Sequence, residues 1–292
     1  SFPTRRSSDL ISGKYPYAIA QHLTSELNSC HQWLIDNKLS LHLGKTEAML
    51  LGSKHKLKKV QNFTVSCNNI EIKRTNSMTY LGSIIDETLS GEEMVNNIVK
   101  KSNSRLKFLY RHAISLSKQT RKTLATALIQ CHFDYSCSSW YSGLNENLKK
   151  KLQIIQNKLT RFILNKGPRE HIGQKELSSI GSLKVEDRVK QLKLNHVHKI
   201  FNNSAPAYMT HNFDRLSGNH NYSLRNHSLN FFVPSISKQL EKTTFFYTGI
   251  IEWNKLPSHI KMIISKPTFK FQVKKYLNEA ALIQEDNSFI YH

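Results

Sequence analysis

The sequence predicts an α+β fold, with one helix and a small antiparallel sheet followed by a mostly helical region. Short runs of alternating apolar and polar residues, typical of strands, are confined to residues 47–85. Apolar residues spaced by three and four, typical of amphipathic helices, dominate from residue 93 onward. Hydrophobic residues make up 39% of the 292-residue chain, which is ordinary for a globular protein with a core.

Residues 1–10 (SFPTRRSSDL) have neither hydrophobic periodicity nor the apolar stretch of a signal peptide. They resemble the translation of a common sequencing-library adapter. We therefore expect this segment to be foreign to the fold and the natural chain to continue upstream of residue 11. The alternative is a disordered natural N-terminus. In either case Asp9 is not counted as a candidate catalytic carboxylate.

Residues 11–88 are expected to form the helix and the small sheet. A helix is predicted over 17–37, because one stripe of apolar side chains repeats there at helical spacing: Leu23, Leu27, Cys30 and Leu34. A short buried strand is predicted over 47–51, followed by a basic loop over 54–59. Residues 63–66 and 70–73 predict a hairpin whose asparagines adopt the positive φ of the turn. A further strand, broken by Gly82, is predicted over 78–85.

Residues 89–166 are expected to form a bundle of three helices packed beside the sheet. The first begins near Glu93, the second spans about 118–133, and the third spans about 145–164. The predicted buried face of the first consists of Val95, Ile98, Leu106, Leu109 and Ala113. The predicted buried face of the third consists of Leu148, Leu152, Ile155, Leu159 and Phe162.

Residues 167–292 predict a C-terminal helical extension that contains a long polar loop. Gly167 and Pro168 interrupt the chain, and a fourth amphipathic helix follows over 184–202. Residues 203–243 are rich in Asn, Ser and His and predict a loop, with an extended piece over 230–234. Short helices are expected at 244–255 and 267–281, and the polar tail from Gln284 is expected to fray.

Charge is the most informative feature of the composition. The chain has 42 Lys and Arg against 21 Asp and Glu, which gives a net charge of +21. Such an excess favours an acidic polymer or surface as partner, and nucleic acid is the usual one. No acidic residue occurs between Glu93 and Asp134. The expected nucleic-acid-binding residues lie in this stretch: Lys100, Lys107, Arg111, Lys118, Arg121 and Lys122. The alternative is a solvated charged face, but such a face normally mixes both signs.

Other residue types give no sign of a metal or redox site. The four cysteines include no CxxC pair, and Cys131 and Cys137 are expected to be small buried hydrophobic residues. His196 and His198 are two residues apart in a predicted helix and should face different sides. Trp33, Trp140 and Trp253 are interpreted as core residues. No stretch is apolar enough for a membrane helix, so we expect an intracellular protein without a membrane partner.

Three ordered segments resemble the reverse transcriptases of non-long-terminal-repeat (jockey-like) retrotransposons, over roughly residues 11–280. The first is WLIDNKLSLHLGKTEAM (33–49), which is similar to motif D of the polymerase palm. The second is Tyr80-Leu81-Gly82, which is similar to the primer-grip hairpin of motif E. The third resembles thumb and post-thumb sequence and comprises the 121–140 segment, QIIQNKL (153–159) and WNKLP (253–257).

The resemblance implies a partial palm (11–88), a helical thumb (89–166) and a C-terminal extension (167–292), with an RNA/DNA template–primer as partner. In the intact family Lys45 would lie near the phosphates of the incoming nucleotide, and Tyr80, Leu81 and Gly82 would form the primer grip. The alternatives are a solvated lysine at position 45 and, for residues 80–82, a strand with a bulge glycine. The element's life cycle would place the protein in cytoplasm and nucleus.

The chain departs from the family at the catalytic centre. Reverse transcriptases hold two Mg²⁺ ions on aspartates, two of which are adjacent. Here Asp36, Asp86, Asp134, Asp187 and Asp214 are isolated along the sequence. We therefore expect a C-terminal reverse-transcriptase fragment that binds template–primer without nucleotidyl transfer, and that has no cofactor and no small-molecule ligand. The alternative is a non-enzymatic basic helical module that binds nucleic acid or another protein.

Overall fold

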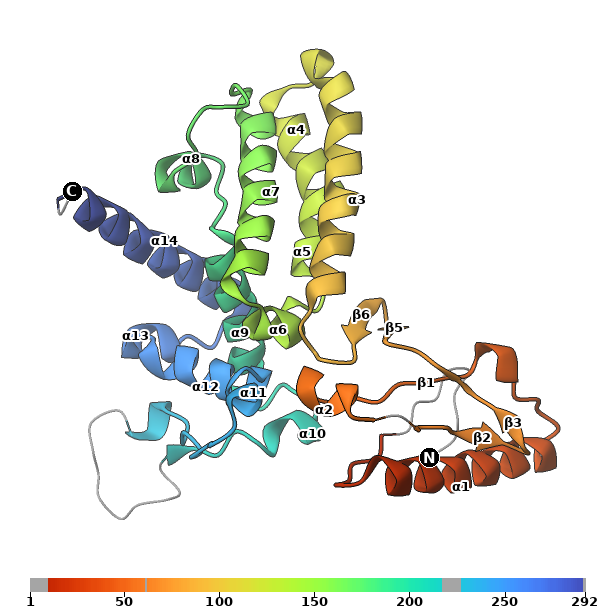
Figure 1. Ribbon diagram of the computed structural model, residues 1–292. Helices are drawn as coiled ribbons and strands as arrows, with labels where there is room; N and C mark the ends of the chain where they lie inside the picture. Colours follow the sequence, from red (N-terminus) through yellow and green to blue (C-terminus); the bar gives the residue numbers. More distant parts are fainter. Residues whose placement is uncertain (1–9, 61, 217–226, 291–292) are drawn as a thin grey trace. The chain divides into compact units, whose positions relative to one another are not determined.

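The computed structural model describes residues 10–60, 62–216 and 227–290 and divides the chain into two compact units, Ser1–Ser90 and Gly91–His292 (Figure 1). Helices and short two-stranded sheets are both present, so the α+β class is confirmed. The adapter-like segment lies outside the described residues except for Leu10. The same holds for residues 217–226 of the predicted polar loop.

The first unit is one long helix with short strands beside it. Its elements are α1 (Pro16–Asp36), η1 (Leu43–Lys45), β1 (Glu47–Ala48), α2 (Lys54–Lys58), β2 (Ser66–Cys67), β3 (Ile70–Glu71), β4 (Lys73–Arg74), β5 (Ser77–Tyr80) and β6 (Ser83–Asp86). Helix α1 confirms the prediction for 17–37, and Pro16 favours its start because its fixed φ suits the first helical turn. The predicted basic loop instead contains α2, whose N-terminus is capped by the Ser53 side chain.

The core of this unit is small. Its buried residues are Ala20, Leu50, Leu57, Phe63, Val65, Cys67 and Ile72, against which Leu23 and Leu27 of α1 pack. Helix α1 lies beside the β2–β3 hairpin, and the Thr24 hydroxyl accepts a hydrogen bond from the Ser66 amide (Figure 1). The hairpin turn confirms the prediction, since Asn68 and Asn69 have φ values of 47° and 64°.

The strands do not form the single antiparallel sheet that we expected. They form three separate two-stranded ladders, β1–β4, β2–β3 and β5–β6, and the first of these is parallel. The segment predicted as one strand over 78–85, broken by Gly82, is two strands, and the break includes Leu81 as well, since Leu81 and Gly82 have φ values of 46° and 83°. Two successive left-handed residues reverse the chain in a tight turn, which gives a hairpin in place of one strand.

The second unit begins with the predicted three-helix bundle. Helix α3 (Glu92–Arg111) runs up. Next, α4 (Lys118–Ala125), the π-helical turn η3 (Thr126–Gln130) and α5 (Cys131–Asp134) run down, and α7 (Glu146–Leu164) runs up again (Figure 1). Side-chain caps at Ser117 and Asn145 begin the second and third helices. The predicted apolar faces are buried, except that Ala113 is only half-buried in the short turn η2 (Ala113–Ser115).

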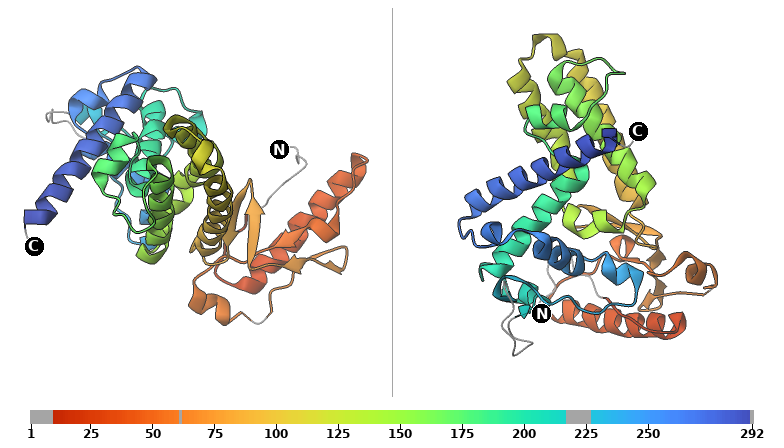
Figure 2. Two further views of the ribbon diagram at one scale, coloured as in Figure 1. Left: turned by 90° about the horizontal axis from the view of Figure 1, so that it is seen from above. Right: turned by 90° about the vertical axis from the view of Figure 1, so that its left-hand side faces the viewer.

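Helix α9 is the centre of the second unit. The remaining elements are α6 (Cys137–Trp140), η4 (Tyr141–Gly143), α8 (Gln174–Ser179), α9 (Val185–Phe201), α10 (Ala207–Thr210), η6 (His227–Leu229), α11 (Gln239–Lys242), α12 (Phe245–Lys255), α13 (Ser258–Lys261) and α14 (Lys266–Ile290). Helix α9 contacts α7 of the bundle on one side and α12 and α14 on the other (Figure 2). It therefore joins the bundle to the C-terminal helices.

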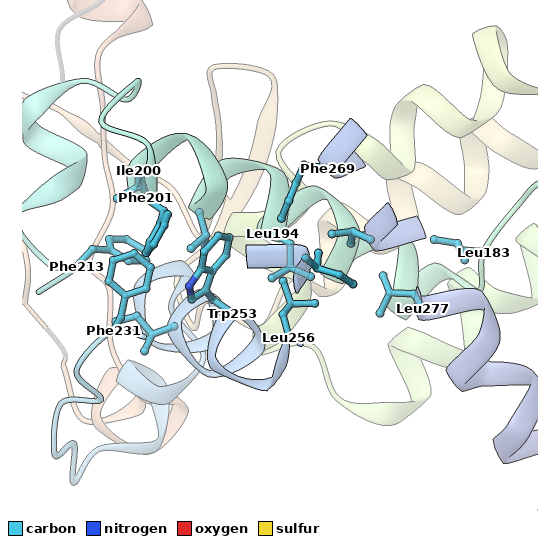
Figure 3. Packing of buried hydrophobic residues seen from close by; sticks show 14 residues of the cluster. Leu183, Leu194, Ile200, Phe201, Phe213, Phe231, Trp253, Leu256, Phe269 and Leu277 are labelled. Carbon is cyan, nitrogen blue, oxygen red and sulfur yellow. The ribbon is translucent and has the colours of Figure 1, made fainter. Parts of the chain in front are cut away.

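An aromatic cluster forms the core between α9, α12 and α14 (Figure 3). Trp253 is fully buried there, and its ring lies 4.9 Å from that of Phe201 and 5.8 Å from that of Phe269. The Trp253 indole N–H donates to the Leu229 carbonyl. The cluster confirms Trp253 as a core residue, whereas Trp33 and Trp140 are only half-buried.

Several predictions for this unit need correction. Cys137 is buried, but Cys131 is exposed because the π-helical turn shifts the register of the helix just before it. Helix α14 continues to Ile290, beyond the expected end near 281, and Glu285 on this added length accepts a hydrogen bond from the Gln174 amide. Short helices α10 and α11 occur within the predicted loop.

Candidate nucleic-acid interface

The outer face of α3 carries the predicted row of cations. Lys100, Lys107 and Arg111 are all exposed, while the opposite side of the helix is buried against the bundle. Positions separated by seven and eleven residues lie on one side of an α-helix, so the three charges form a row along its length. One heptad advances the row by about 10 Å.

Helix α7 contributes two further cations beside this row. The Lys151 ammonium donates to the Asn96 side-chain oxygen at 3.3 Å, and the Lys158 ammonium donates to that of Asn103 at 3.3 Å. Both pairs join residues 55 apart and lie one heptad apart in each helix. This constant register fits two helices that run side by side in the same direction. We call Lys100, Lys107, Arg111, Lys151 and Lys158 the α3–α7 basic face.

No carboxylate offsets the charge of this face. Within the part of the chain that the structure describes, none of its five cations forms an ion pair, and the two asparagine partners are neutral. Elsewhere in the unit lysines do pair with carboxylates, such as Lys149 with Glu146 at 2.8 Å. Uncompensated like charges produce a positive field that attracts polyanions.

Two aromatic residues accompany the cations. Phe108 is 55% exposed on α3, and its ring lies 5.1 Å from that of His112. Tyr110 has a structural role, since its hydroxyl donates to the Lys158 carbonyl at 3.3 Å and its ring meets Phe162 edge-on. Burial raises the pKa of the Tyr110 phenol. Phe108 is therefore the aromatic side chain with a free face for stacking on a base or sugar.

Arg121 does not belong to the interface, contrary to our expectation. It is buried, and its guanidinium donates to the carbonyls of Ala113, Leu116 and Phe162 and to the Asn165 side chain. Ala113 and Leu116 lie in and directly after the η2 turn that follows α3, and Phe162 and Asn165 lie at the end of α7, where helix carbonyls lack intrahelical partners. Arg121 therefore ties the segment after α3 to the end of α7, and four of its five N–H donors are used in these contacts.

The other two predicted cations lie apart from the face. Lys118 is exposed at the start of α4. Lys122 is half-buried, and its ammonium lies beside Gly181, in the turn that follows α8. Sequence reasoning missed two cations of the face, Lys151 and Lys158. The only signal for them in the sequence is their seven-residue spacing, which equals the spacing of Asn96 and Asn103.

The remaining predicted site residues belong to the first unit. Tyr80 ends β5, and Leu81 and Gly82 form the tip of the β5–β6 hairpin, with Tyr80 and Leu81 exposed. Lys45 is exposed at the end of the η1 turn. These residues lie on two separate loops of the unit.

The aspartates are used in structural contacts. Asp86 accepts hydrogen bonds from the Thr88 and Ser90 amides and so fixes the turn after β6. Asp134 accepts two hydrogen bonds from the Arg188 guanidinium, at 2.7 and 3.1 Å. Among the described residues there is no group of three or more His, Cys, Asp or Glu side chains arranged to hold a metal ion.

His196 and His198 lie in different surroundings, as predicted. His196 is exposed on α9, whereas His198 is buried, stacks on Phe269 at 4.0 Å and is hydrogen-bonded to the Ile263 carbonyl. Burial lowers the pKa of the His198 imidazole, and partial desolvation, together with the ammonium groups of Lys199 and Lys266, lowers the pKa of the more exposed His196.

No helix in the described ranges combines the length and apolar character needed to cross a membrane. Comparisons with protein-family models, with curated proteins and with solved structures each found no match to this chain.

Proposed function

We propose that this chain binds the phosphate backbone of nucleic acid through the α3–α7 basic face, and that it does so as the C-terminal part of a retrotransposon reverse transcriptase. The observation that carries the proposal is the α3–α7 basic face, whose five exposed cations have no carboxylate partner among the described residues. The resemblance of residues 33–49, 80–82, 121–140, 153–159 and 253–257 to that family supplies the biological setting.

The chemistry of the face favours phosphate contacts over base reading. The ammonium group of lysine and the guanidinium group of arginine neutralise phosphates with little dependence on the base sequence. Successive cations on α3 advance by about 10 Å per heptad, a length comparable to three base-pair steps of duplex. Phe108 adds one exposed ring that can stack without base preference.

Within this proposal the chain holds the template–primer and does not itself transfer nucleotides. Asp86 fixes a turn, and Asp134 and Asp187 form ion pairs with Arg188 and Lys190. Lys45 and the Tyr80–Gly82 tip keep the roles that the resemblance implies, near the nucleotide phosphates and the primer. Mg²⁺ chemistry belongs to the aspartates of the intact family.

Salt-dependent binding tests the proposal. We expect a duplex oligonucleotide to bind with an affinity that falls steeply as salt rises, because each neutralised phosphate releases a counterion. Replacing Lys100, Lys107 and Arg111 with glutamine should reduce the slope of log affinity against log salt by about 3. If the protein contacts only the phosphate backbone, we expect the triple variant to reduce the salt slope equally for an RNA–DNA hybrid and for a DNA duplex.

A matched control uses three cations that pair with carboxylates. The ammonium groups of Lys238, Lys255 and Lys275 each lie within 4 Å of the carboxylate of a glutamate three or four residues away in the sequence. Replacing them with glutamine changes the net charge by the same amount and should leave the salt slope nearly unchanged. Equal loss in both triple variants would mean that only net charge matters and would overturn the assignment of the face. Binding that is absent or insensitive to salt would favour the alternative, a protein-interaction module.

A further inference from the structure

A second group of cations lies around the turn after α8. Gly181 in this turn has a φ of +65°. A Cβ atom placed there would lie 3.6 Å from the Lys274 ammonium of α14 and 3.8 Å from the Lys122 ammonium of α4. The two nitrogens are therefore less than about 8 Å apart, although their residues come from distant parts of the chain.

Nothing in the described structure neutralises these two lysines. Both side chains are half-buried, and neither has a hydrogen bond or an ion pair to another described residue. Burial lowers the pKa of the Lys274 ammonium, and the charged groups that add to this effect are Arg188, Lys122 and Lys270, all of them cations. Partly buried charges of one sign are costly unless a counter-charge is supplied.

The neighbouring cations differ in their availability. Arg188 is already engaged by Asp134 through two hydrogen bonds, so its charge is offset locally. Lys270 is exposed on α14 one turn before Lys274 and adds to the field without reaching Gly181. The amide N–H groups of Gly181 and Ser182 are used within the turn, on the Ser178 and Leu177 carbonyls. The available donors are thus the ammonium groups of Lys122 and Lys274.

We propose that Lys122 and Lys274 form a binding site for a phosphate group at the Gly181 turn, separate from the α3–α7 basic face. A tetrahedral oxyanion presents several acceptor oxygens, so it can accept from both ammonium groups at once through charge-assisted hydrogen bonds of about 2.8 Å. The absence of a Cβ at Gly181 leaves room for the ligand next to the two nitrogens. The bound group joins α4 to α14 and removes the repulsion between the lysines.

The phosphate group can come from free phosphate or pyrophosphate, or from the backbone of a nucleic acid. This inference stands on the Lys122–Gly181–Lys274 geometry and does not require the proposed function. Inorganic phosphate and pyrophosphate are therefore the first probes, and a duplex oligonucleotide is the second.

The test compares the full chain with the double variant Lys122→Gln, Lys274→Gln. Pyrophosphate is titrated by calorimetry at constant ionic strength, and the thermal midpoint is followed with phosphate in place of chloride. We expect saturable binding to the wild type and a loss of affinity of about tenfold or more in the variant, since each charge-assisted hydrogen bond contributes substantially. In the absence of phosphate the variant should be at least as stable as the wild type, which shows that it folds.

The control variant is Lys175→Gln, Lys275→Gln, which removes two exposed lysines from α8 and α14 without touching the turn. It should bind pyrophosphate as the wild type does. A second outcome is that only the oligonucleotide binds. If its affinity is then reduced in the Lys122→Gln, Lys274→Gln double variant but not in the control variant, the site holds a phosphate of the nucleic-acid backbone. Equal responses of the wild type and both variants to every probe would overturn the proposal, because phosphate would then act as a general salt.

Discussion

The lysine at position 193 should make the stability of this protein depend on pH in a direction opposite to that of a salt-bridged lysine. Lys193 lies on α9 and is only 4% exposed. Its ammonium donates to the Ser142 hydroxyl and, at 2.9 Å, to the Thr248 hydroxyl. Burial lowers its pKa to about 8, with partial opposition from Glu252. The perturbation is Lys193→Met, which leaves an unbranched side chain one atom shorter and removes the charge.

The magnitude follows from the shift in pKa. An exposed lysine in the unfolded chain titrates near 10.4, so the charged form of Lys193 is disfavoured in the native state by about 3 kcal/mol. Below pH 8 both states carry the proton and this cost is fully present. Between pH 8 and about 10.4 the native state loses the proton first, so the unfolded state binds more protons and stability rises with pH.

The methionine variant lacks this rise. At pH 7 it gains about 3 kcal/mol from the removed charge and loses two hydrogen bonds worth about 1 kcal/mol each, so it should be about 1 kcal/mol more stable. The Thr248 hydroxyl keeps its bond to the Thr244 carbonyl. Near pH 10.5 the order should reverse, with the wild type about 2 kcal/mol more stable.

Urea unfolding of both proteins at pH values from 7 to 10.5 measures this difference. Other titrating groups are common to both proteins and cancel. Lys150→Met, which changes an exposed lysine on α7, should show no comparable dependence on pH. A wild-type-minus-variant difference that is constant across the range would refute the reasoning, because Lys193 would then be as well solvated as the control.

Three further changes test the fold. Trp253→Ala should lower the free energy of unfolding of the second unit by about 3–5 kcal/mol, because it leaves a cavity in the aromatic cluster and removes the hydrogen bond to the Leu229 carbonyl. Urea unfolding measures this, and a loss below about 1 kcal/mol would contradict full burial of the indole. Arg121→Met should cost about 3 kcal/mol or more, since several buried carbonyls lose a donor. The folded fraction should bind duplex with an unchanged salt slope, and a reduced slope would return Arg121 to the interface. Leu81→Asn should stabilise the first unit by about 1 kcal/mol, because asparagine tolerates the left-handed conformation at this turn; slower hydrogen exchange in β5 and β6 would report it.

Sequence patterns alone predicted the long helices and the positive sign of the net charge. Helices α1, α3, α7, α9 and α12 follow from apolar residues repeated at three and four, a local pattern that does not need tertiary partners to be seen. The strands were harder to predict, because each is two to four residues long and is defined by its partner strand. The break at Gly82 between β5 and β6 was predicted, but the positive φ of Leu81 was not, since nothing in a leucine indicates it.

Tertiary structure alone decided the role of each basic residue. Lys100, Arg121 and Lys122 look alike in the sequence, yet one is exposed on α3, one binds helix-end carbonyls and one lies beside Lys274. Two of the partners of Arg121, Phe162 and Asn165, are 41 and 44 residues away, and Gly181 and Lys274 are still farther from Lys122. A side chain's hydrogen bonds and neighbouring charges depend on which segments the fold brings together, whereas the period of a helix depends only on the residues within it.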